Sequence, residues 1–192
     1  MPREKKRHAL LGKVARRTLE LLVWRTVTQL PSTDKYVIIG APHTSLWDYP
    51  LTFLYLYSIN VRARWLANGK THPLLPKRVV RALGGFDLPQ RTAHNRVDAL
   101  VEQFTHHDDL VMGFVPEGTT AFVPRWNTGF YHVAIGAGVP IVLGFMDYPS
   151  RTIGLAHAFM PSGNLDTDLA ALRNYYLGKQ GRHPERTGPI KL

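Results

Sequence analysis

The amino-acid sequence predicts a single α/β domain whose sheet is mixed but mostly parallel, with helices on both faces. Short apolar runs rich in β-branched residues alternate along the chain with segments of helical periodicity, the pattern typical of βαβ units. The 192 residues suit one domain, and 44% hydrophobic with 20% charged residues is the composition of a folded chain. We expect residues 31–178 to form the domain, preceded by a basic amphipathic helix over 1–30 and followed by a polar tail over 179–192.

The apolar runs and the helical spacings fix the expected order of elements. The predicted strands are 36–40, 61–67, 110–115, 139–146 and 152–159. The predicted helices are 4–29, 51–59, 73–83, 97–104, 129–137 and 166–177. The tail from residue 178 onward is polar, and we expect it to be loosely packed.

The first predicted helix is basic in its first half, where positive charge opposes the helix dipole. This placement is easier to understand if the helix meets an anionic membrane surface, as basic amphipathic helices do. The alternative is a solvated basic face on an ordinary helix. Its candidate apolar stripe consists of Leu10, Leu11, Val14, Leu21, Leu22 and Val27.

Charge and cysteine content restrict the function classes. The net charge of +10 attracts polyanions, but the sequence shows no nucleic-acid-binding module, so we expect no nucleic-acid partner. The absence of cysteine excludes disulfides, thiolate nucleophiles and zinc–thiolate sites. The histidines and aspartates at 106–109 fit a solvated loop, and we expect no metal. With no secretory signal and no apolar run long enough to span a bilayer, the expected location is cytoplasmic and peripheral to the membrane.

His43 and Asp48 follow the predicted strand 36–40 directly, at the place where α/β sheets present ligand-binding groups. Residues five apart on one helix differ by about 140° and do not face each other. His43 must therefore lie in the loop before the helix, with Asp48 in or beside the first turn. Either Ser45 caps that helix, or Asp48 does so with Pro50 in the first turn.

In both arrangements an ionised Asp48 can accept a hydrogen bond from one imidazole nitrogen of His43. The other nitrogen is then free to take a proton from an incoming hydroxyl, which makes His43 a candidate general base. The alternative is that Asp48 only caps the helix and His43 only lines a turn.

A second candidate region is the Pro-Glu-Gly-Thr turn that follows the predicted strand 110–115. Gly118 permits a backbone conformation that other residues avoid, or the close approach of a ligand. Backbone N–H groups and the hydroxyls of Thr119 and Thr120 could then bind phosphate oxygens or a developing oxyanion. The alternative is a plain turn with a solvated Glu117.

Four sequence blocks resemble those of the glycerolipid (lysophosphatidic acid) acyltransferase superfamily, and they follow one another along the chain in the order found in that family. Residues 43–48 (His-Thr-Ser-Leu-Trp-Asp) resemble its His-x4-Asp (HX4D) block, and 114–119 (Phe-Val-Pro-Glu-Gly-Thr) its Pro-Glu-Gly-Thr block. Residues 83–86 (Leu-Gly-Gly-Phe) resemble its Gly-Gly block, and 138–143 its Val-Pro-Ile-Val strand. The resemblance covers about residues 36 to 160.

The resemblance implies transfer of a fatty acyl group from acyl-CoA or acyl-carrier protein to the hydroxyl of a lysophospholipid or a related acceptor, at a membrane surface. It implies that His43 is the base and Asp48 its orienting carboxylate, and that the turn of Glu117, Gly118 and Thr119 binds the acceptor's phosphate or supports the oxyanion. We expect no cofactor beyond the acyl donor, and no covalent acyl-enzyme.

Two departures from the family pattern concern charge. Thr120 stands where the family usually has arginine, and Gln90 occupies the expected arginine position of the Gly-Gly block, with Arg91 next to it. One interpretation is that Arg91 and Arg125 reach the same anion from shifted positions; another is that both are surface charges. A further alternative is a non-catalytic or altered-substrate member that binds anionic lipid.

Overall fold

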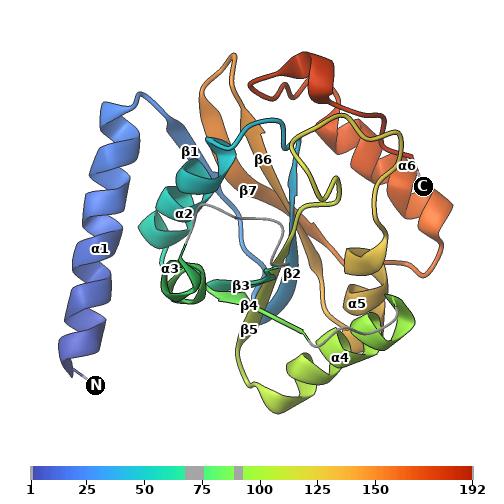
Figure 1. The fold of residues 1–192 in the computed structure, drawn as a ribbon, viewed down its shortest axis with the longest axis horizontal. Helices are drawn as coiled ribbons and strands as arrows, with labels where there is room; N and C mark the ends of the chain where they lie inside the picture. Colours follow the sequence, from blue (N-terminus) through green and yellow to red (C-terminus); the bar gives the residue numbers. More distant parts are fainter. Residues whose placement is uncertain (1, 68–75, 89–92, 192) are drawn as a thin grey trace.

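The computed structural model describes residues 2–67, 76–88 and 93–191 (Figure 1). These residues form a seven-stranded sheet in the order β1-β7-β6-β2-β5-β3-β4. The strands are β1 (Arg25–Thr28), β2 (Lys35–Ala41), β3 (Ala63–Leu66), β4 (Gly85–Phe86), β5 (Leu110–Phe114), β6 (Ile141–Asp147) and β7 (Thr152–Phe159). All neighbouring strands in this sheet run parallel except β6 and β7. The predicted mixed, mostly parallel sheet is confirmed.

Helices cover both faces of the sheet (Figure 1). They are α1 (Pro2–Leu21), α2 (Asp48–Ser58), α3 (Lys77–Ala82), α4 (Ala93–His106), α5 (Gly129–Ala137), α6 (Leu165–Tyr176) and the short 3-10 helix η1 (Pro184–Arg186). Among the described residues, no helix combines the length and the apolar character needed to cross a bilayer.

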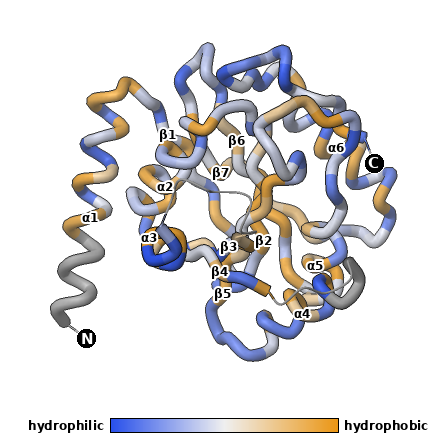
Figure 2. The backbone as a smooth tube through the Cα atoms, in the orientation of Figure 1, coloured by the Kyte–Doolittle hydropathy of each residue, from blue (hydrophilic) through white to orange (hydrophobic). Residues whose placement is uncertain are grey.

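The central strand β2 separates two hydrophobic cores, because successive side chains of a strand point to opposite faces. Val37 and Ile39 pack in the core shared with α4, α5 and α6. Tyr36 and Ile38 pack in the core shared with α1 and α2. Hydrophobic residues make up much of the central strands (Figure 2), as a mostly parallel sheet covered on both faces requires.

The register of β2 and β5 brings two loops to the same edge of the sheet. Ile39 pairs with Phe114 in these parallel strands, so the chain leaves both strands side by side. The loop after β2 carries His43 and the loop after β5 carries Glu117. The carboxyl edge of the sheet is therefore the place where a site built from these two residues forms.

The N-terminal segment differs from the prediction of one helix over residues 1–30. The helix α1 ends at Leu21, Val23 takes a positive φ of 59°, and Arg25–Thr28 form the edge strand β1 paired with β7. The reason is tertiary: backbone pairing with β7 outweighs a helical spacing that is only local. The predicted stripe residues Leu10, Val14 and Leu21 are exposed, whereas α1 buries Ala15 and Leu19.

The expectation of a loosely packed tail is wrong. The C-terminal segment (residues 179–191) turns back over the domain, and the N–H of Trp126 donates to the carbonyl of Lys191 at 2.7 Å. Nε of Arg173 donates to the carbonyl of Ile190 at 2.7 Å, and the Ile190 side chain packs on the hydrophobic core. Polar composition did not indicate this packing, because the segment is held mainly through its backbone carbonyls.

Candidate active site

His43 and Asp48 form a buried pair at the carboxyl end of β2. Nδ1 of His43 lies 3.1 Å from Oδ2 of Asp48, and the two residues are 7% and 1% exposed. As predicted, His43 lies in the loop and Asp48 lies in the first turn of α2. The edge of the His43 ring meets the ring of Tyr49 with their centroids 4.7 Å apart, which limits rotation of the imidazole.

Neither expected capping arrangement occurs. The cap position of α2 is Trp47, which makes no side-chain cap bond, and Asp48 is the first helical residue. Instead, Oδ2 of Asp48 accepts hydrogen bonds from the N–H groups of Thr44 and Ser45 at 2.9 and 3.0 Å. Asp48 thus folds the loop back onto itself, and this fixes where His43 lies relative to the helix.

Glu117 ties the second region to the first. Its Oε1 accepts a hydrogen bond from the backbone N–H of His43 at 3.1 Å, and the side chain is buried. The alternative of a solvated Glu117 is therefore wrong. The two candidate regions meet at one place, although 74 residues separate them in the sequence.

The two buried carboxyl groups have pKa values shifted in opposite directions. Burial raises the pKa of Glu117 to about 7, even though the hydrogen bond from His43 lowers it. Burial also opposes ionisation of Asp48, but hydrogen bonds from His43 and Tyr148 outweigh it, and the pKa of Asp48 lies below its ordinary value. Asp48 is therefore the ionised acceptor, whereas burial favours the protonated form of Glu117.

Two polar atoms of the site lack a partner among the described residues. They are Nε2 of His43 and Oε2 of Glu117. Buried polar atoms without a hydrogen bond are rare and call for an explanation. With Nδ1 donating to Asp48, Nε2 is the basic nitrogen, and no described group occupies it.

The turn after Glu117 adopts the conformation that its glycine was expected to allow. Gly118 has φ +68°, and its N–H donates to the carbonyl of Val115 at 3.0 Å. The hydroxyl of Thr119 accepts from the N–H of Ala121 at 3.2 Å, and Thr120 is half-buried. One expected donor, the Gly118 N–H, is therefore occupied by the turn itself.

The predicted arginines are not joined to this site in the structure. Arg125 is exposed, and within the described part of the chain no hydrogen bond or ion pair links it to His43, Asp48 or Glu117. Arg91 and Gln90 lie outside the described residues.

Sequence reasoning missed two contributors. Tyr148, which follows β6, donates its hydroxyl to Oδ1 of Asp48 at 2.6 Å. The C-terminal segment also reaches the loop: the N–H of His183 donates to Oγ1 of Thr44 at 3.1 Å, and Nη1 of Arg186 donates to its carbonyl at 3.4 Å. Tyr148 could have been suspected, because it directly follows a strand that lies next to β2. The polar sequence of the C-terminal segment gave no comparable signal.

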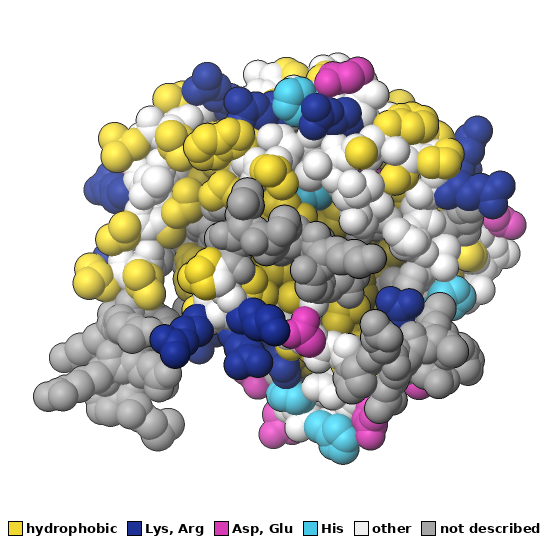
Figure 3. All heavy atoms as spheres, viewed as in Figure 1, with side chains coloured by type: hydrophobic (Ala, Val, Ile, Leu, Met, Phe, Trp, Pro, Cys, Tyr) yellow, Lys and Arg dark blue, Asp and Glu magenta, His cyan; other side chains and the backbone are white. Residues whose placement is uncertain are grey.

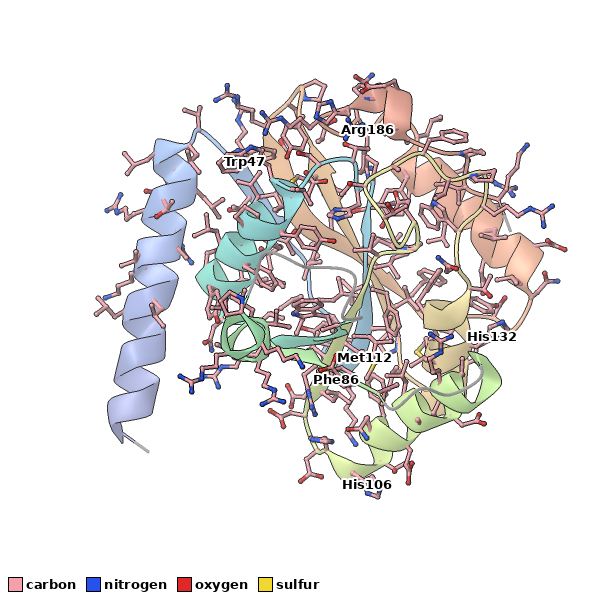
Figure 4. All side chains as sticks on the ribbon, viewed as in Figure 1. Trp47, Phe86, His106, Met112, His132 and Arg186 are labelled. Carbon is pink, nitrogen blue, oxygen red and sulfur yellow. The ribbon has the colours of Figure 1, made fainter. Side chains whose placement is uncertain are left out.

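The site occupies one end of the molecule. Trp47 and Arg186 lie at that end in Figure 4, whereas Phe86 and His106 lie at the other. A groove of about 1850 Å³ opens near the opposite edge of the sheet, lined by α1, α2 and the starts of β3 and β5, and contains none of the site residues. Its walls include Lys13, Arg16, Arg62, Arg64 and Arg81. In the described part of the chain, no cluster of three or more histidines and carboxylates suits a metal ion.

Comparison with solved structures finds a similar fold. The 1-acyl-sn-glycerophosphate (LPA) acyltransferase PlsC from Thermotoga maritima superposes with a TM-score of 0.58 at 17% sequence identity. The match covers 90% of this chain and 78% of that chain. No protein-family model and no curated protein matches the sequence. The chain therefore shares its single-domain α/β fold with this acyltransferase.

Proposed function

We propose that this chain is an O-acyltransferase that moves a fatty acyl group from a thioester to a hydroxyl. The observation that carries the proposal is the buried His43–Asp48 pair: Nε2 of His43 has no partner among the described residues, and the backbone N–H of the same residue donates to Glu117. The fold shared with an LPA acyltransferase supports the same reaction class.

The reaction proceeds without a covalent enzyme intermediate. Nε2 of His43 takes the proton from the acceptor hydroxyl as its oxygen attacks the thioester carbonyl carbon. Asp48 stabilises the imidazolium that forms. The carbon–sulfur bond then breaks, and the imidazolium returns its proton to the leaving thiolate. Since the Gly118 N–H is engaged, the N–H groups of Thr119 and Thr120 are the donors we assign to the oxyanion.

The donor we propose is acyl-CoA or acyl-carrier protein, and the acceptor is a lysophospholipid or a related lipid hydroxyl. Arg91 and Arg125 remain our candidates for the acceptor's anionic group, with Glu117, Gly118, Thr119 and Thr120 beside the reacting centre. Arg186 adds a cation that already contacts the loop carrying the base, through the carbonyl of Thr44. A guanidinium is suited to phosphate because it offers paired, charged donors.

We also propose that the protein works at the surface of an anionic membrane, on the cytoplasmic side. Hydrophobic side chains gather over the end of α1 and the start of α2, next to Lys and Arg side chains (Figure 3). The exposed ones in these segments include Leu21, Leu22, Val23, Leu46 and Trp47. An exposed apolar surface beside cations suits an anionic bilayer.

The test of the reaction is thioester turnover by His43→Ala and Asp48→Asn variants. Palmitoyl-CoA and 1-oleoyl-lysophosphatidic acid serve as probes, and thiol release is followed with Ellman's reagent, to which a protein without cysteine adds no background. We expect a loss of about 100-fold or more in kcat for each variant, the usual contribution of general-base catalysis.

Matched controls separate catalysis from folding. Asp168→Asn removes another buried carboxylate that accepts from a tyrosine, and His132→Ala removes an exposed histidine on α5. Both should keep the wild-type rate per folded molecule. Undiminished turnover in folded His43→Ala and Asp48→Asn would overturn the mechanism. Vesicle binding without turnover of any acyl thioester would favour the non-catalytic, lipid-binding alternative.

A further inference from the structure

The carboxylate of Asp48 uses its two oxygens differently. Oδ2 accepts from Nδ1 of His43 and from the N–H groups of Thr44 and Ser45. Among the described residues, the partner of Oδ1 is the hydroxyl of Tyr148, at 2.6 Å. Because Asp48 is only 1% exposed, the bond from Tyr148 decides whether Oδ1 is satisfied.

Tyr148 is held by parts of the chain other than the loop it contacts. Its ring packs edge-on against Trp24 with the centroids 5.2 Å apart. Its N–H donates to the carbonyl of Gln180 at 3.0 Å, and its own carbonyl accepts from Arg151 at 3.2 Å. Tyr148 is thus anchored by the turn after β6, by Trp24 just before β1 and by the C-terminal segment together.

The charges around this hydroxyl define its role as a donor. Burial raises the pKa of the Tyr148 phenol, and the hydrogen bond to ionised Asp48 raises it further, while the nearby Arg182 lowers it. The other titratable groups near Asp48 are His43, Tyr49 and Glu117. The phenol therefore keeps its proton at physiological pH and gives the hydrogen bond to the carboxylate.

We propose that Tyr148 is a positioning residue, which orients the Asp48 carboxylate so that Oδ2 faces Nδ1 of His43 and keeps Nε2 as the basic nitrogen. The phenol keeps its own proton throughout the reaction. It acts through Asp48 and contacts no reacting atom. This inference rests on the proposed general-base role of His43.

The deciding comparison is Tyr148→Phe against Tyr131→Phe. Tyr131 donates to Oδ2 of the buried Asp168 at 2.7 Å. Both variants therefore lose a tyrosine hydrogen bond to a buried carboxylate, but only Tyr148→Phe loses it beside His43. Both should lose thermal stability by similar amounts. We expect only Tyr148→Phe to lower kcat, by about 10- to 100-fold, the factor that a hydrogen bond to a charged group is worth. The KM for the acceptor should stay within about twofold, because the phenol contacts no substrate.

Two further measurements, the pH dependence of kcat and the tautomer of His43, should change in Tyr148→Phe only if Tyr148 acts through Asp48. Loss of the phenol hydroxyl destabilises the negatively charged form of the His43–Asp48 pair, so the pair takes up a proton at higher pH. The acid limb of the plot of kcat against pH should therefore shift to higher pH. In ¹⁵N-histidine spectra, wild-type His43 should be the Nδ1–H tautomer, and Tyr148→Phe should show a mixture. The spectra need no substrate.

The outcomes distinguish this inference from the proposed function. An inactive His43→Ala with an unchanged Tyr148→Phe rate and tautomer would overturn the role of Tyr148 alone. An active His43→Ala would overturn the proposed function. A mixed tautomer with a lowered kcat in Tyr148→Phe, absent from Tyr131→Phe, supports the inference.

Discussion

Glu117 is a buried carboxyl group, and burial makes its ionised form energetically unfavourable. Its Oε1 accepts from the His43 N–H, and its Oε2 lacks a partner among the described residues. Burial therefore favours the protonated form, in which one oxygen accepts from His43 and the other can donate to a ligand.

The raised pKa of Glu117 predicts a specific dependence of stability on pH. The pKa is 4.5 without the protein environment and about 7 in the folded chain, so the folded state binds the proton more tightly between these values. The stabilisation from this group is complete below pH 4.5 and is lost as the pH rises through about 7. The loss is on the order of 3 kcal/mol.

Glu117→Gln should remove this dependence while keeping an oxygen that can accept from His43. Chemical denaturation at pH 4.5 and 7.5 should show that the free energy of unfolding falls less in the variant than in wild type. Glu102→Gln, a change at an exposed carboxylate, should follow wild type. An equal fall of the free energy of unfolding in wild type and Glu117→Gln would show that folding does not raise the pKa of Glu117.

At the scale of single residues, the sequence predicted contacts between residues that lie close together in the chain. His43 and Asp48 lie five positions apart, and the need to face each other placed one in the loop and the other in the first helical turn, as observed. Tyr148 contacts Asp48 across 100 positions, and no local pattern specifies such a contact. The capping expectation failed because the Asp48 side chain binds N–H groups that precede its helix.

At the scale of elements, the C-terminal segment acts as a brace on the loop that carries His43. Its backbone passes so close to Thr44 that a Cβ on Gly181 would lie 2.4 Å from Oγ1 of that threonine. His183 and Arg186 then hold the same threonine through its hydroxyl and carbonyl. The segment therefore influences where His43 lies without lining the reacting centre.

Gly181→Ala should disturb this contact, because the added methyl group has to displace Thr44 or the segment. We expect kcat to fall at least severalfold, with a loss of stability of about 1–3 kcal/mol, typical of overpacking. The control is Gly129→Ala, because nothing lies within 4 Å of the Cβ that it adds. This variant should leave kcat and stability unchanged. A Gly181→Ala protein with wild-type kcat would show that the brace is dispensable for positioning.

The strands and helices were predictable where the apolar pattern is strong. The buried strand β2 and the helix α5 fall where their periodicity placed them. The edge strand β1 was missed because its pairing partner β7 lies about 125 residues further along the chain. The packed C-terminal segment was missed because backbone hydrogen bonds leave no signature in composition.

At the scale of the whole molecule, α1 presents apolar side chains on the face that it does not bury. It contributes Ala15 and Leu19 to the protein interior, while Leu10, Leu11 and Val14 stay exposed among basic residues. Exposed apolar positions that do not pack in the domain are available to a lipid surface.

The membrane proposal predicts selective binding to anionic vesicles. The chain should sediment with vesicles containing phosphatidylglycerol more than with pure phosphatidylcholine, and high salt should weaken the binding. Val14→Asp should lower the bound fraction at least severalfold. Met160→Asp changes a residue of similar exposure, 57% against 55%, between β7 and α6, and should bind as wild type does. Equal binding to both vesicle types would contradict an electrostatic membrane surface.

The reversed direction of β7 has a consequence for the architecture of the site. Because β7 runs antiparallel to β6, the two form a hairpin whose tight turn lies at the carboxyl edge and delivers Tyr148 to Asp48. A parallel β7 would instead need a crossover connection that leaves this edge. Lengthening the turn of this hairpin would therefore move Tyr148 relative to Asp48, whereas replacing its strands would also change core residues such as Met146 and Ile153.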